Sequence, residues 1–304
     1  SLDMYKKFTY TNRESYSLDY IGKTEVDESK LDWHEMGYSS HKDVYSNDWK
    51  TWVEYNIQDV ELVEKINDKL NLLEQVLQMS YDAGVNYEDV SSPVRMCDSI
   101  IYKHLRDRDV VIPQKRSEAQ KRDYEGGHVK DPQVGAHDWV VSFDLNSLYP
   151  HLIMQYNISP ETMIGQRFPE AISVNQLLNQ EVNTEVLGDK LTVTPNNACF
   201  RKDISGFLPE LMDKMYGDRV KFKKYALDAS RRYEETKDKK YLKEISKYNN
   251  IQMARKIALN SAYGAIGNQY FRYYNEKMAT AITTSGQLSI RWICLLYTSD
   301  AADE

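Results

Sequence analysis

Two long stretches with helical spacing, joined by a short polar segment, constrain the fold of this 304-residue chain more than any other feature. The first stretch runs from about Phe207 to Tyr233, and the second leads to Gly264. Between them, Glu234-Glu-Thr-Lys-Asp-Lys239 is polar and short enough to be the turn of an antiparallel helical hairpin. The sequence therefore predicts two long helices that lie side by side.

Three cations fall at about the same height of this hairpin. Arg219 and Lys223 form an i,i+4 pair on the first helix. With a rise of about 1.5 Å per residue and a tip near Thr236, Arg219 lies about 26 Å down one helix and Lys256 about 30 Å down the other. Cations at one height on neighbouring helices suit a polyanion, and Arg adds bidentate geometry.

The alternative is that these cations only keep a helical face in contact with water. The local charge bears on this choice. From Lys214 to Lys243 there are eleven Lys or Arg against five Asp or Glu, although the whole chain has a net charge of -7. A local excess of this size fits an electrostatic contact with phosphates.

A second segment, Val140-Val-Ser-Phe-Asp-Leu-Asn-Ser-Leu-Tyr-Pro150, places one carboxylate next to a tight turn. The apolar run from Trp139 to Phe143 predicts a strand, and Pro150 suits the first turn of a helix. Asp144 would then stand at a strand end, followed by free backbone N–H groups, which suits a divalent metal and the phosphates it carries. Taken alone, an Asp after an apolar run is more often a turn residue or a helix cap.

Together these residues resemble those of family B DNA polymerases, most closely the replicative polymerases of T4-like bacteriophages. Five elements occur in the family's order between about Met4 and Ile293. They are the exonuclease motif Tyr55-x-x-x-Asp59, the element Tyr124-x-Gly126-Gly127, motif A at Asp144 to Pro150 with its continuation Asn157 to Thr162, the pair Arg219 and Lys223, and motif B at Lys256 to Gly264 with its continuations Phe271 to Tyr274 and Ala279 to Thr284.

The resemblance implies an α+β, multidomain fold that is incomplete relative to the family. The segments it implies are the C-terminal part of a 3′–5′ exonuclease domain at 1–71, a bridging segment at 72–115, palm at 116–205, fingers as an antiparallel helical hairpin at 206–268, and a palm helix at 269–293. The tail at 294–304 resembles no part of the family.

The implied activity is template-directed addition of deoxynucleotides to a primer with two Mg²⁺ ions, in viral DNA replication. Asp144 would bind both metals, and the carbonyl of Leu145 would be a further ligand. Backbone amides near Ser147 and Leu148 would contact the triphosphate. Arg219, Lys223 and Lys256 would neutralise the negative charge of the triphosphate, and Asn260 would add a hydrogen bond.

Two tyrosines are implied to select the substrate. Tyr149 would be the steric gate, a ring beneath the sugar that leaves no room for a 2′-hydroxyl. Tyr263 would pack on the nascent base pair and check its shape, with Gly264 allowing the close approach; on sequence alone that glycine could equally end a helix.

Template contact and proofreading are implied by two further elements. Tyr124, Gly126 and Gly127 would meet the template strand. Asp59 would bind metal in the exonuclease site, and Tyr55 would position the attacking water one helical turn away. On that helix we expect the buried positions to be supplied by Val53, Ile57, Val60 and Val63.

Composition bounds the remaining possibilities. The three cysteines are far apart, so neither a disulfide framework nor a zinc site is indicated. We see no membrane span or signal peptide, which with the resemblance predicts the cytoplasm of an infected bacterium. The expected partners are primer–template DNA and deoxynucleoside triphosphates. A sliding clamp is possible by family, although the region that would bind it is absent.

The chain also departs from the family. No Asp-Thr-Asp motif follows residue 293, and the acids of the two earlier exonuclease motifs are missing. The last eleven residues, Cys294 to Glu304, match the translation of a transposon-end sequencing adapter, the alternative being a natural helix end with an acidic tail. We therefore expect a fragment of a proofreading DNA polymerase that extends no primer by itself. The competing interpretations are a nucleotide- and DNA-binding remnant without turnover and a structural or partner-binding helical protein.

Overall fold

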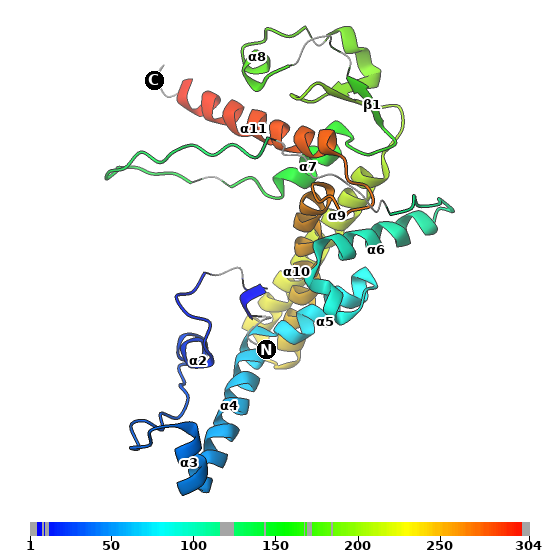
Figure 1. The fold of residues 1–304 in the computed structure, drawn as a ribbon. Helices are drawn as coiled ribbons and strands as arrows, with labels where there is room; N and C mark the ends of the chain where they lie inside the picture. The colour runs from blue at the N-terminus through cyan, green and yellow to red at the C-terminus, as the bar shows by residue number, and fades with distance from the viewer. Residues whose placement is uncertain are drawn as a thin grey trace. The chain divides into compact units, whose positions relative to one another are not determined.

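The computed structural model describes residues 5–7, 9, 12–115, 125–142, 144–166, 168, 172–183 and 185–299. The chain divides into two compact units, Ser1–Gln78 and Met79–Glu304. Figure 1 shows that helices make up most of both. Within the described ranges, no helix is both long and apolar enough to cross a membrane.

The first unit is built on α4 (Trp49–Leu70), against which α2 (Leu18–Val26) and α3 (His41–Asn47) pack. The helix begins where the Asp48 side chain accepts a hydrogen bond from the amide of Thr51, and it ends at Asn71 in the left-handed conformation. Its buried residues are Leu62 and Ile66. The core of the unit also contains Tyr5, Ile21 and Leu72.

Our prediction of which face of α4 is buried is wrong. Val53, Ile57, Val60 and Val63 are all exposed. Tyr55, Asp59, Leu62 and Ile66 have the i,i+4,i+7,i+11 spacing of a single face, and this is the face that is partly or fully buried. Because a helix presents only one such line to a neighbour, the valines lie on other sides of α4.

The predicted helical hairpin is confirmed. In the second unit, α9 (Phe207–Thr236) and α10 (Lys240–Ile266) lie side by side, joined by residues 237–239 (Figure 1). The turn closes at Lys237, which has a positive φ of 56°. Tyr248 of α10 packs between the two helices, with its ring centroid 5.4 Å from that of Tyr225 and 6.2 Å from that of Phe222.

The core of the second unit surrounds the base of this hairpin. There α6 (Pro93–Arg106) packs against α10, and α7 (Leu148–Tyr156) packs against α9 and α11 (Glu276–Ser299). The largest side chains of this core that are fully buried are Phe200, Ile153, Ile158, Leu208, Leu259, Ile266, Met278 and Ile282. The helix α5 (Leu72–Ala83) crosses the boundary between the units, and the short helix η1 (Tyr87–Ser91) leads from it to α6.

A small sheet completes the second unit. The strands β1 (Met163–Gln166), β2 (Leu191–Val193) and β3 (Ala198–Arg201) are antiparallel, in the order β1-β3-β2. Met163 and Thr192 both pair with Phe200. The helix α8 (Val174–Leu178) and the helix η2 (Glu185–Lys190) lie between β1 and β2 in the chain. A mostly helical chain with one small sheet agrees with the predicted α+β class.

The strand predicted from Trp139 to Phe143 is wrong for the residues that the structure describes there. Residues 125–142 contain no helix or strand, and Trp139 is 98% exposed. Phe143 lies outside the described residues. A strand needs a neighbour to pair with its N–H and C=O groups, and the three-stranded sheet is made by other segments. Propensity alone therefore does not make this run a strand.

Candidate functional site

The turn before α7 is the centre of the candidate site. Ser147 is the N-cap of α7 and adopts a left-handed conformation, with φ 54° and ψ 46°. Its carbonyl oxygen accepts hydrogen bonds from the amide of His151 at 3.1 Å and pairs with the Nδ1 atom of His151 at 2.9 Å. The first amides of α7 follow this turn, and such amides favour an anion nearby.

Arg219 brings the hairpin to this turn. Its Nη1 atom donates hydrogen bonds to Oδ1 of Asn146, at 3.2 Å, and to Oγ of Ser147, at 2.9 Å. One turn earlier on α9, the ring of Tyr216 meets that of His151 edge to face, with 4.6 Å between centroids. Asn146 was not among the predicted site residues, although its place between Asp144 and Ser147 was a signal that could have found it.

The rings of Tyr149, from motif A, and Tyr263, from motif B, are in contact. Their ring centroids are 4.6 Å apart and the ring planes are inclined at 49°. Both side chains are half-buried. Tyr149 belongs to α7 and Tyr263 to α10, so the contact joins segments that are more than a hundred residues apart in the sequence.

Two polar residues of α11 hold the segment that precedes Gly127. Gln287 Nε2 donates hydrogen bonds to the carbonyl of Gly126 at 2.8 Å and to Oε1 of Glu125 at 3.0 Å. The hydroxyl of Thr283 donates to the carbonyl of Glu125 at 2.7 Å. The sequence analysis named neither as a site residue, although Thr283 lies in the Ala279 to Thr284 continuation of motif B, which was a signal. Tyr124 lies outside the described residues.

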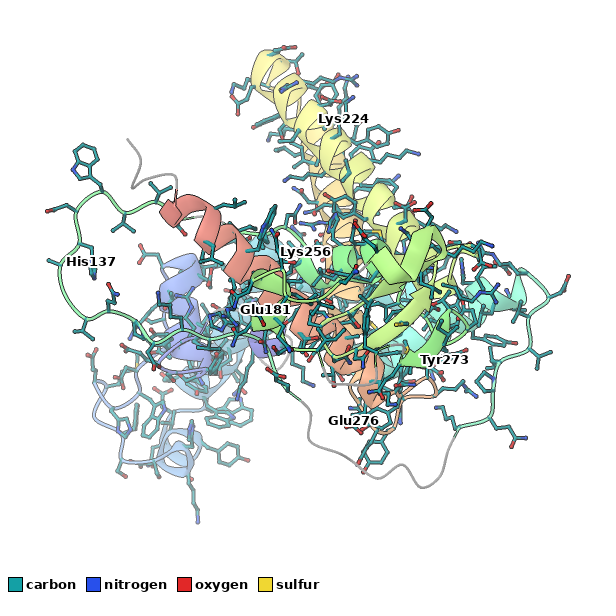
Figure 2. All side chains as sticks on the ribbon, turned by 90° about the horizontal axis from the view of Figure 1, so that it is seen from above. His137, Glu181, Lys224, Lys256, Tyr273 and Glu276 are labelled. Atoms are coloured by element: carbon teal, nitrogen blue, oxygen red, sulfur yellow. The ribbon has the colours of Figure 1, made fainter. Side chains whose placement is uncertain are left out.

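Lys223, Lys256 and Asn260 are exposed on the hairpin. Figure 2 shows Lys256 nearer the base of the hairpin than Lys224. Arg255 of α10 lies 3.7 Å from Asp218 of α9, which fixes the register of the two helices.

This register supports the predicted common height of the cations. If Asp218 and Arg255 are level, Arg219 and Lys256 differ by two residue rises, or about 3 Å. Gly264 is exposed, and a Cβ atom built there would meet nothing within 4 Å. The backbone near Gly264 is therefore open to a ligand.

The residues present fit only part of a two-metal site. Asp144 and Leu145 are exposed at the entrance to the turn. In the part of the chain that the structure describes, no three His, Cys, Asp or Glu side chains gather closely enough to hold a metal ion. Two Mg²⁺ ions need more than one carboxylate, so Asp144 does not supply such a site alone.

In the first unit, Tyr55 and Asp59 meet a lysine that was not predicted. Lys30 forms an ion pair with Asp59 at 2.8 Å, and its Nζ atom lies 4.6 Å from the centroid of the Tyr55 ring. Burial by itself would lower the pKa of Lys30, but its hydrogen bonds with Asp59 and Tyr55 and the charge of Asp59 outweigh this effect, so the pKa is raised. The lysine thus stays charged beside the carboxylate.

Comparison with known proteins shows the family. The family model for DNA polymerase family B matches residues 94–296, about two thirds of the chain. A DNA-directed DNA polymerase of Escherichia phage RB69 is 33% identical over 96% of this chain, and one of Enterobacteria phage T4 is 32% identical over the same share.

More distant relatives include DNA polymerase 1 of Pyrococcus abyssi, 27% identical over 77% of the chain. The chain spans 36% of the length of each of the two phage relatives. The family model covers α7, the hairpin and most of α11, which carry the contacts described above for the second unit. The chain therefore belongs to family B of the DNA polymerases.

Proposed function

We propose that this chain contributes the nucleotide site of a DNA-directed DNA polymerase, which adds deoxynucleotides to a primer along a template during viral DNA replication. One observation carries the proposal: Arg219 of the hairpin hydrogen-bonds to the motif A turn at Asn146 and Ser147. The hairpin and the turn thereby form two sides of one site. The names of the phage relatives support the same activity.

The cations of the hairpin bind the triphosphate in this proposal. Arg219 lies beside the first amides of α7, and the exposed Lys223 and Lys256 are the other two cations. Amides near Ser147 and Leu148 would donate to phosphate oxygens, and Asn260 would add a hydrogen bond. Because charge builds up on the phosphates in the transition state, cations already in place lower the barrier.

Asp144 and the carbonyl of Leu145 would hold Mg²⁺. Two such ions are expected: one would supply activation of the attacking 3′-hydroxyl, and the other would stabilise the triphosphate and the leaving pyrophosphate. Among the described residues no three potential metal ligands gather at this turn, so the chain also fits a second candidate, a nucleotide- and DNA-binding segment without turnover.

Tyr149 and Tyr263 would select the nucleotide. Their contact supports this, because two rings beside the turn that would bind the triphosphate would meet the sugar and the base. Tyr149 would exclude a 2′-hydroxyl as the steric gate. Tyr263, with Gly264 beside it, would check the shape of the new base pair, and Gly126 and Gly127 would contact the template.

The first unit would belong to the 3′–5′ proofreading exonuclease. In that role, Asp59 would be a metal ligand and Tyr55 would position the water. We also infer action in the cytoplasm of an infected bacterium on primer–template DNA, with a sliding clamp as a possible partner.

The test compares two cations of α9 in the complete polymerase, meaning a protein of the phage relatives' length that carries this chain. We expect Arg219→Ala to raise KM for deoxynucleotides by about 10- to 100-fold, because a charge-assisted contact to phosphate is lost. Lys221→Ala is the matched control, since Lys221 is exposed on the same helix and contacts the Tyr225 ring. Equal kinetics for the two variants would contradict the proposal.

A further inference from the structure

The ring of Tyr149 lies against two glycines from different parts of the chain. A Cβ atom built on Gly286 of α11 would lie 3.0 Å from Cε1 of Tyr149 and 3.7 Å from Cδ1. A Cβ atom built on Gly127 would lie 3.0 Å from the Tyr149 hydroxyl oxygen. Contacts of 3.0 Å are tighter than real Cβ atoms normally make, so a side chain at either position would displace the ring by a few tenths of an ångström.

Gly286 is an unusual residue for its place. It is buried inside α11, a helix of 24 residues, where glycine costs about 1 kcal/mol relative to alanine. Glycine in a helix interior is favoured where another group must approach the backbone closely. Tyr149 is that group here, because its ring carbons are the nearest atoms to the missing side chain.

The segment that contains Gly127 is held in place by the same helix, α11. Gln287, next to Gly286, donates a hydrogen bond to the carbonyl of Gly126, and Thr283 donates to the carbonyl of Glu125. The helix α11 therefore contacts the Tyr149 ring and also holds the segment next to Gly127, which lies beside the Tyr149 hydroxyl.

We propose that Gly286 is a specificity-determining residue: its lack of a side chain sets how deeply the Tyr149 ring sits, and hence the room left for the sugar of the incoming nucleoside triphosphate. This inference rests on the proposed function of Tyr149 as the steric gate. Tyr149 is half-buried, and a Cβ atom on Gly286 would touch its ring edge. In this inference a methyl group on α11 pushes the ring away from that helix and reduces the room for the sugar.

The first experiment measures kcat/KM for a deoxynucleoside and a ribonucleoside triphosphate in the complete polymerase. We expect Gly286→Ala to raise the preference for the deoxynucleotide by about fivefold, because displacements of this size at a site change rates by such factors. Gly217→Ala is the control, since Gly217 lies exposed in α9 and a Cβ atom there would meet nothing within 4 Å. A preference equal to or below that of the wild type overturns the inference.

Removing the ring separates this inference from the proposed function. Tyr149→Ala should lower the preference, and Gly286→Ala added to it should change nothing further. If Tyr149→Ala leaves the preference unchanged, the steric gate itself is wrong. If Tyr149→Ala lowers it while Gly286→Ala alone has no effect, the gate stands and the role of Gly286 is wrong.

A second experiment needs no activity and uses the 304-residue chain. We expect Gly286→Ala to lower the thermal unfolding midpoint when Tyr149 is present. In the Tyr149→Ala background the same change should leave the midpoint equal or higher, because alanine is the better helix former. An equal loss in both backgrounds would show that the ring does not limit this position, and would overturn the inference even if Gly286→Ala folds poorly.

Discussion

Asn157 joins the end of α7 to the beginning of α9 through a single side chain. Its Nδ2 atom donates to the carbonyls of Arg201, at 2.6 Å, and Ile204, at 2.7 Å, and its Oδ1 atom accepts from the amide of Gly206 at 3.0 Å. The residue has a positive φ of 56°, a conformation that asparagine tolerates better than most residues. These contacts give a physical reason for an asparagine at the start of the Asn157 to Thr162 continuation of motif A.

We expect Asn157→Ala to lower the free energy of unfolding by about 2–4 kcal/mol, because three backbone groups lose their partner and alanine is strained at positive φ. Urea denaturation of the chain measures this. Asn157→Asp keeps the acceptor for Gly206 but loses both donated bonds, so its loss should also be large. Asn179→Ala is the control at an exposed helix end, and a loss there as large as that of Asn157→Ala would contradict the prediction.

At the scale of elements, the same motif A continuation caps α9. Oε1 of Glu161 accepts a hydrogen bond from the amide of Phe207 at 2.5 Å, and Oγ of Ser159 accepts one from the amide of Leu208 at 3.4 Å. A carboxylate at a helix N-terminus is also favoured by the helix dipole. The direction in which α9 leaves the core is therefore fixed by side chains about fifty residues earlier in the sequence.

The long helices could be predicted from sequence because their spacing is local. The first was expected at about Phe207 to Tyr233 and is Phe207–Thr236. The strand expected from Trp139 to Phe143 is absent from the described residues there because strand pairing depends on distant segments. The prediction of the buried face of α4 was wrong for a similar reason: two of its faces carry apolar residues, and the positions of α2 and α3 decide between them.

His104 makes the contact between α6 and α9 sensitive to acid. It lies beside Glu210 of α9, which also pairs with Arg108. Burial lowers the pKa of His104, and the charge of Arg108 lowers it further, while Glu210 opposes both. The unfolded chain therefore takes up the His104 proton at a higher pH than the folded chain does, so stability falls as the pH drops below the ordinary value of 6.5.

We expect the urea midpoint of the chain to fall between pH 7.5 and pH 5.5, and the fall to be smaller in His104→Gln, which cannot take up a proton. His137→Gln is the control, because His137 lies at an exposed position in residues 125–142. A fall that is equally large in His104→Gln would show that other groups cause the acid sensitivity.

At the scale of the whole molecule, sequence reasoning named most of the residues that the fold brings together. Tyr149 and Tyr263 are in contact, and Arg219 reaches the motif A turn. Asn146, Thr283, Gly286, Gln287 and Lys30 were missed. Asn146 could have been found from its place in motif A. The others make contacts with residues far away in the chain, such as Thr283 with Glu125 and Lys30 with Asp59, and contacts of that kind cannot be read from spacing.

The number of carboxylates near the motif A turn limits what the chain can catalyse by itself. Asp144 is the carboxylate at the motif A turn, and among the described residues no group of three potential metal ligands comes together there or elsewhere. Because transfer through two metal ions needs more than one carboxylate, we expect the 304-residue chain to extend a labelled primer no faster than a blank in Mg²⁺.

The complete polymerase serves as the positive control for this measurement. There we expect Asp144→Asn to lower the extension rate by at least about a thousandfold, because the removed carboxylate would bind both cations. Extension by the 304-residue chain that Asp144→Asn abolishes would contradict the prediction. It would mean that one carboxylate, with the cations of the hairpin and the amides of α7, is enough to assemble the reacting groups.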